Sequence, residues 1–138
     1  MKKKWLILCF GLAASIFFFI LFSKSNNQLK YSHEFNHKSA IIDYANLDIQ
    51  PILNQSENKL IFEMKILSYM DQMMLQLNYK EHCVLEIGQS VISPMDWTVS
   101  NREPNTIEGV LTFNIEDKLV DQFLLKFFTL DETVIYWP

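Results

Sequence analysis

The stretch KLIFEMKIL, residues 59–67, decides the fold of this chain. It carries an apolar side chain at every second position, at Leu60, Phe62, Met64 and Ile66. Successive side chains of a β-strand point to opposite faces of a sheet. This period of two therefore predicts a strand with one face turned to an apolar core and a mixed outer face.

Other stretches of the same kind lie on both sides of it. Alternation recurs in MMLQLNY, CVLEI, VLTFNI, FLLKFF and VIYW, residues 73–79, 83–87, 110–115, 123–128 and 134–137, and more weakly in IIDYANLDI, residues 41–49. Turn-forming residues separate these stretches, and Pro94 and Pro104 fall in connections. About seven short strands in about 100 residues predict an antiparallel immunoglobulin-like β-sandwich over residues 40–138. An antiparallel barrel is the alternative architecture. A helix over residues 120–128 is an alternative.

The N-terminus is apolar. Residues 5–22, WLILCFGLAASIFFFILF, are 18 uncharged positions, which as a helix span about 27 Å, close to the thickness of a bilayer core. The basic tip, residues 1–4, contains three lysines and predicts a cytoplasmic N-terminus. We expect a single-pass membrane protein with its C-terminal domain outside the cytoplasm. A signal peptide cleaved near Ser23-Lys24-Ser25 is the alternative, with the same direction of export.

Charge and cysteine content narrow the classes of function. Without the three cytoplasmic lysines, 9 basic residues stand against 16 acidic ones, a net charge of −7. Because a phosphate backbone is bound chiefly through Lys and Arg, this balance excludes nucleic acid as a partner. Cys9 lies in the apolar segment and Cys83 in the exported domain, so no internal disulfide forms. Its apolar surroundings in the sequence predict that Cys83 is buried.

The polar stretch SKSNNQLKYSHEFNHKS, residues 23–39, predicts a spacer between membrane and domain. It contains HEFNH, residues 33–37, which matches the H-E-x-x-H pattern of zinc peptidases. That chemistry requires a helix, because only there do two histidines four apart share a zinc ion. The polar spacer, with Lys38 directly after the motif and no third ligand, argues against a peptidase.

A looser metal site is the wider alternative. His33 and His37 are the candidate ligands for zinc or copper, and His82-Cys83 and the thioethers of Met70, Met73, Met74 and Met95 are candidate soft ligands for cuprous ion. The structural interpretation of the same residues places Met73 and Met95 in core gaps, with Met70 and Met74 in turns or on the surface.

Other reactive side chains give weaker signals. Ser93 and Ser100 have no assignable histidine and acid, so no catalytic triad is predicted. The carboxylates Asp96, Glu103 and Glu108 surround one predicted connection and favour a solvated acidic loop over a calcium site or a catalytic pair. Trp97 and Trp137 are predicted as core anchors rather than ligand-binding surfaces.

Four pieces of sequence carry a resemblance to a known family: LIFEMKI, Pro94 and Trp97 within SPMDW, EGVLTF at residues 108–113, and Tyr136-Trp137. Over residues 59–137 the chain resembles a family of small exported bacterial and archaeal β-sandwich domains of unknown function. The resemblance implies an extracytoplasmic sandwich. The corresponding loop of the family is rich in glycine and histidine, whereas residues 98–107, TVSNREPNTI, contain neither, so the resemblance implies no metal ligands here.

The sequence thus predicts a non-enzymatic, membrane-anchored binding or accessory domain without a cofactor, held by residues 5–22 and interacting with another protein of the cell envelope. An envelope protein that binds copper or zinc through His33 and His37 is the alternative, and an H-E-x-x-H zinc peptidase is a distant one.

Overall fold

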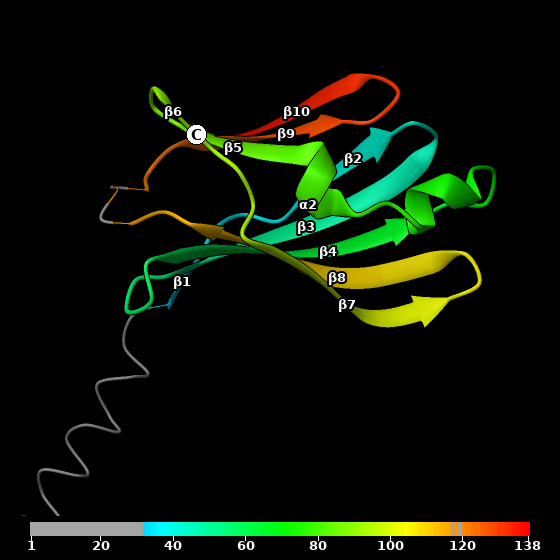
Figure 1. The fold of residues 1–138 in the computed structure, drawn as a ribbon, viewed down its shortest axis with the longest axis horizontal. Coiled ribbons are helices and arrows are strands. Elements are labelled where there is room, and N and C mark those ends of the chain that lie inside the picture. The colour runs from blue at the N-terminus through cyan, green and yellow to red at the C-terminus, as the bar shows by residue number, and fades with distance from the viewer. Residues whose placement is uncertain (1–31, 117, 119) are drawn as a thin grey trace, which may run out of the picture. The chain divides into compact units, whose positions relative to one another are not determined.

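Two antiparallel sheets pack against each other as a β-sandwich in the computed structural model of the chain, which describes residues 32–116, 118 and 120–138 (Figure 1). The larger sheet has the order β1-β3-β4-β8-β7, with β2 also paired to β3, and the smaller has the order β10-β9-β5-β6. The larger sheet consists of β1 (Ser32–Glu34), β2 (Lys38–Ile42), β3 (Ala45–Asn54), β4 (Lys59–Leu67), β7 (Asp96–Glu103) and β8 (Thr106–Asn114). The smaller consists of β5 (Cys83–Ile87), β6 (Ser90–Ile92), β9 (Phe123–Phe128) and β10 (Glu132–Trp137).

The strand over residues 59–67, β4, is the middle of the larger sheet. β4 pairs with β3 from Asn54↔Lys59 to Asn46↔Leu67, and with β8 along its whole length. The alternating side chains of residues 60, 62, 64 and 66 are all buried. The strand predicted over residues 59–67 is therefore confirmed, and so is the strand predicted over residues 123–128, which form β9 rather than the alternative helix.

Aromatic side chains hold the two sheets together. The ring centroid of Phe62 in β4 lies 5.6 Å from that of Phe113 in β8. Across the sandwich it lies 5.9 Å from Phe123 and 5.8 Å from Trp137. Phe123 and Trp137 stack at 5.1 Å. Trp137 is 2% exposed, which confirms it as a core anchor. Such edge-to-face and stacked pairs contribute about 0.5–1.5 kcal/mol each beyond the area they bury.

Trp97 is partly buried and packs against this core from β7. Its ring meets Tyr79 edge-on at 5.0 Å. The ring lies against the backbone of Gly109 in β8, where a methyl group would overlap it and would lie 2.9 Å from the Thr98 carbonyl oxygen. Glycine at this position lets a tryptophan cover the sheet.

Residues 73–79 are not the strand that their alternation predicts. They fall in a 3₁₀ turn, η1 (Gln72–Leu75), and in a short helix, α2 (Tyr79–His82). Asp71 accepts a hydrogen bond from the backbone N–H of Met73, and Asn78 accepts one from that of Lys80. These two caps satisfy N–H groups that a strand would pair with a neighbour.

The burial of the methionines also differs from the prediction. Met73 and Met95 are exposed, so the prediction of these two as core residues is wrong. Met74 lies in the 3₁₀ turn η1, one of the two places predicted for it, but its side chain is buried. Met70 is exposed, as predicted.

Two further stretches differ from expectation. Residues 98–107 form the β7–β8 hairpin rather than a loop. Residues 32–34 and 38–39, within the predicted spacer, belong to β1 and β2. The indole Nε1–H of Trp137 donates to the Asn36 carbonyl at 2.7 Å, and Gln50 donates to the Phe35 carbonyl at 2.6 Å. These bonds dock residues 35–37 on the domain.

The predicted membrane segment, residues 5–22, lies outside the described residues. Within residues 32–116, 118 and 120–138, no helix has the length and hydropathy needed to cross a bilayer.

We expect Gly109→Ala to lower the free energy of unfolding by about 1–3 kcal/mol, as overpacking in a filled core typically does. Urea unfolding followed by tryptophan fluorescence measures the change. In a Trp97→Phe background, which shortens the ring, the cost of the same substitution should fall, as expected for coupled neighbours, but should not vanish, because the added methyl group still meets the Thr98 carbonyl oxygen. An equal cost in both backgrounds would contradict the assigned contact.

Candidate functional site

The H-E-x-x-H residues lie on a strand and in the connection that follows it. His33 is in β1 opposite Leu53, and Lys38, the residue after His37, is opposite Ile49. The two partners are four residues apart on β3, a separation of about 13 Å along a strand. Zinc ligands must each approach the ion to about 2.0–2.1 Å. The strand geometry therefore holds the two histidines apart, and the helix that a peptidase requires is replaced by extended backbone.

Each of the three histidines contacts a different group of the protein rather than another histidine. The His33 ring meets the Phe35 ring edge-on at 4.7 Å. His37 Nε2 lies 3.8 Å from an Asp48 carboxylate oxygen, with both side chains about half exposed. His82 Nδ1 lies 3.0 Å from the Phe128 carbonyl, while the neighbouring Cys83 side chain is buried. In the part of the chain that the structure describes, no three His, Cys, Asp or Glu side chains gather as a metal site.

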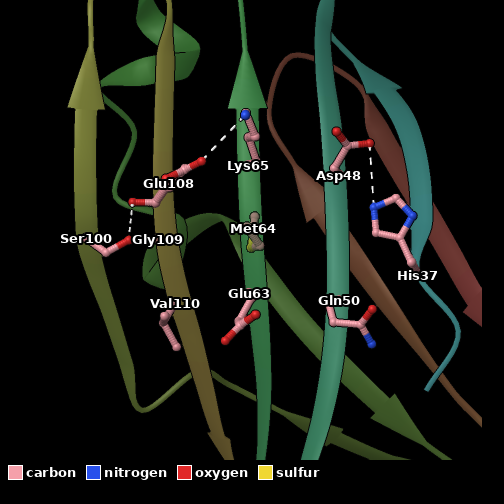
Figure 2. A pocket seen from close by; sticks show the side chains of 10 residues that line it. All are labelled: His37, Asp48, Gln50, Glu63, Met64, Lys65, Ser100, Glu108, Gly109 and Val110. Carbon is pink, nitrogen blue, oxygen red and sulfur yellow. Dashed lines mark hydrogen bonds and ion pairs between the residues drawn. The ribbon is translucent and has the colours of Figure 1, made fainter. Parts of the chain in front are cut away.

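His37 and Asp48 line a groove of about 450 Å³ on the outer face of the larger sheet (Figure 2). Its other lining residues are Gln50, Glu63, Met64, Lys65, Ser100, Glu108, Gly109 and Val110. Lys65 forms an ion pair with Glu108 at 3.5 Å, and the Ser100 hydroxyl donates to the Glu108 backbone carbonyl at 3.1 Å. The Ser100 hydroxyl is thus bonded to a backbone carbonyl rather than to a histidine or carboxylate base, and the groove resembles a solvated acidic sheet face.

The three carboxylates predicted around one connection are spread over the β7–β8 hairpin. Asp96 is opposite Thr112, and Glu103 is opposite Thr106 near the other end of β7. Glu103 and Glu108 both accept weak hydrogen bonds from Asn101 Nδ2, at 3.5 and 3.4 Å. Asp96 is too far along the strand to complete a calcium site with them.

Two buried titratable groups, Cys83 and Tyr79, stay protonated at neutral pH and are therefore unreactive. Burial raises the pKa of the Cys83 thiol far above its ordinary value. Burial, reinforced by nearby Cys83 and acidic side chains, also raises the pKa of the Tyr79 hydroxyl, which donates to the Met74 carbonyl at 2.7 Å. Both groups stay protonated at neutral pH, and neither is a nucleophile there.

The surface that the sequence analysis missed lies at one end of the sandwich. The β2–β3, β4–η1, β7–β8 and β9–β10 turns meet at the end opposite the start of β1 (Figure 1). The Leu130 N–H donates to Asp43 at 2.8 Å and so joins the β9–β10 turn to the β2–β3 turn. The Ser68 N–H donates to the Asn105 carbonyl at 2.9 Å and joins the β4–η1 connection to the β7–β8 turn.

Large apolar side chains project from this end into solvent. They are Ile41, Tyr44, Tyr69, Met70, Met73 and Leu130, each at least 60% exposed, and we call them the loop-end cluster. Tyr44 has a φ of +67° and follows Asp43 at +45° in a two-residue hairpin turn that ordinarily favours Asn-Gly or Asp-Gly. A tyrosine in this left-handed conformation costs roughly 1 kcal/mol or more, and such strain is typical of functional positions.

Sequence periodicity could not identify the cluster, because its members come from three separate regions of the chain, residues 41–44, 69–73 and 130, that the fold brings to one end. Comparison with protein-family models, curated proteins and solved structures finds no match to this chain. The resemblance over residues 59–137 stays a prediction.

For the histidines, we expect calorimetric titration of the full-length chain in detergent with zinc or cuprous ion to give no submicromolar binding that depends on His33 and His37. The strand spacing separates their rings too far for one ion. The control is the double variant His33→Ala, His37→Ala. Submicromolar binding that this variant abolishes would contradict the geometry and restore the metal site.

For Cys83, we expect no reaction with a thiol-specific reagent at pH 8 in the native Cys9→Ser protein, and full reaction in denaturant. Burial keeps the thiol protonated and covered. The measurement is mass spectrometry of the labelled chain over time. Rapid labelling of the native protein would show that the β5 strand opens readily.

Proposed function

We propose that this protein is a membrane-tethered, extracytoplasmic, non-enzymatic domain that binds another envelope protein through the loop-end cluster. The observation that carries the proposal is the presence of six exposed large apolar side chains at the end of the sandwich where adjoining turns are joined, four in the turns and connections and two in β2 and η1. Each exposed tyrosine alone offers on the order of 150 Å². Together the six side chains therefore expose several hundred Å² of apolar surface, on the order of the area that marks interaction sites on soluble domains.

The residue types support recognition of a protein. Tyrosine and methionine are enriched in protein interfaces, and methionine adapts its shape to different partners. Tyr44 and Tyr69 extend from neighbouring turns because Asn46 and Leu67, two residues from each, are register partners in the β3–β4 hairpin. The two tyrosines supply aromatic surface, and Met70 and Met73 supply more flexible apolar side chains.

The charges around the loop-end cluster indicate the kind of partner surface that would fit it. The turns at residues 43–44, 68–71 and 129–131 contain Asp43, Asp71 and Asp131 and no lysine or arginine. A partner with an apolar contact surface and a rim of Lys or Arg complements this arrangement, and electrostatic attraction would speed its association. Anionic lipid headgroups would be repelled.

The strand order supports an immunoglobulin-like fold. β3-β4-β8-β7 has the order of strands A, B, E and D, and β10-β9-β5-β6 has that of G, F, C and C′. In this correspondence the β4–β5 and β9–β10 connections are the B–C and F–G loops. In immunoglobulin variable domains those loops belong to the binding end. Residues 5–22 as the anchor, with a short polar segment after them, complete the proposed organisation.

A photo-crosslinking side chain in place of Met70 in the full-length protein tests the proposal in native membranes. We expect one discrete adduct with an envelope protein that has a basic, apolar surface. Tyr44→Ser with Leu130→Ser should reduce the adduct about tenfold, a loss of about 1.4 kcal/mol of binding free energy. Higher salt should also reduce it.

The matched control is Met95→Ser, which removes an exposed apolar side chain outside the cluster. This variant should retain the adduct. Equal adducts in the control and in the double variant would contradict a role for the loop-end cluster.

A further inference from the structure

The outer face of the smaller sheet differs in chemistry from that of the larger sheet. Its outward side chains are Val84 and Glu86 in β5, Val91 in β6, Leu124, Lys126 and Phe128 in β9, and Glu132, Val134 and Tyr136 in β10. The outer face of the larger sheet instead carries Asp48, Glu63, Lys65 and Glu108 around its polar groove. In an antiparallel sandwich that is monomeric, outer faces are ordinarily polar.

The apolar side chains of this face are neighbours by register. Glu86 has Val91 on one side and Leu124 on the other, and Leu124 is opposite Tyr136. In the next row, Lys126 lies between Val84 and Val134. Val91, Val134 and Tyr136 each leave about half or more of their surface exposed. We call these two rows the small-sheet face.

One ion pair sits at the centre of the small-sheet face. Lys126 Nζ lies 2.6 Å from a Glu86 carboxylate oxygen. The hydrogen bond to Glu86 raises the pKa of Lys126, so the Lys126 ammonium group stays charged at neutral pH. The two charges cancel within the pair, and Glu132 at the start of β10 leaves the outer face of the smaller sheet with a small net negative charge. The domain as a whole is acidic, with 16 acidic residues against 12 basic ones in the full chain.

We propose that the small-sheet face binds a second copy of this chain across a two-fold axis. A basic partner is attracted to the acidic surfaces, whereas two acidic copies repel each other least where their surfaces are closest to neutral. In a two-fold contact the same patch serves both copies. Lys126 and Glu86 lie on neighbouring strands, one row apart. A two-fold axis that lies in the contact plane and passes between these two residues places Lys126 of each copy opposite Glu86 of the other.

The size of the face sets the strength of the dimer. Four strands about 4.8 Å apart and roughly five residues long cover on the order of 300 Å². Stable interfaces bury about 800 Å² per partner. The dimer is therefore weak in dilute solution and depends on confinement, which the proposed membrane anchor supplies by raising the effective concentration of the copies.

Cross-linking of the full-length chain in membranes tests the contact. In a Cys9→Ser background, Leu124→Cys places a thiol near the centre of the face, and Val110→Cys places one on the outer face of the larger sheet as a matched control. With a short bis-maleimide, we expect Leu124→Cys to give at least about ten times more covalent dimer than Val110→Cys. Equal yields would overturn the proposal.

Charge reversal separates a contact between copies from a structural role within one copy. A Lys126→Glu chain has carboxylates at both central positions, and a Glu86→Lys chain has lysines at both. Each alone should lose most of the Leu124→Cys dimer, whereas co-expression of the two, distinguished by different tags, should restore a mixed dimer. Failure of mixing to restore it would overturn the proposal. The loop-end cluster is intact in all these variants, so the result does not depend on the envelope partner.

Discussion

The contact between Phe62 and the aromatic rings of the opposite sheet is the interaction on which the rest of the structure depends. The described domain has no disulfide, and its one cysteine, Cys83, is free and buried. The two sheets must therefore hold together by packing alone. Phe62 meets both Phe123 and Trp137, and these two stack on each other. Trp137 in turn binds the Asn36 carbonyl, so the core also fixes the segment through which the chain enters the domain.

Because this core is already filled, the remaining large apolar side chains lie on the surface. The inward positions of β3, β4, β8, β5 and β9 are already filled by buried apolar side chains. Side chains such as Tyr44, Leu130 and Val134 have no place in that core, and they lie exposed on the loop-end cluster and the small-sheet face. If both proposals hold, two separate apolar surfaces on one acidic domain would let the protein bind a partner and a second copy at the same time.

The sequence predicted the parts of the fold that strict alternation determines. KLIFEMKIL is the central strand because every second residue is apolar and the core takes one face. Alternation misled in MMLQLNY, where the caps Asp71 and Asn78 determine the local structure. The β7 strand was missed because most of its side chains are exposed, so little apolar pattern marks it. β1 was missed because it depends on pairing with β3 rather than on its own composition.

The loop-end cluster could not be predicted from the sequence, because it depends on contacts between residues far apart in the chain. The exposure of Tyr44 follows from a left-handed turn, and its proximity to Leu130 follows from a hydrogen bond across 87 residues of sequence. The histidines showed the reverse: HEFNH is conspicuous in the sequence, yet pairing with β3 spreads its two rings along a strand. Local motifs and periodicities record neither kind of long-range placement.

Oxidative footprinting of the methionines tests most directly whether the loop-end cluster is covered by a partner. Met70 and Met73 lie in the cluster, and Met95 is an exposed methionine outside it. Comparison of the protein in native membranes with the purified full-length protein should show Met70 and Met73 protected several-fold in the membranes and Met95 oxidised equally in both. Equal oxidation of all three methionines in the two samples would contradict the account.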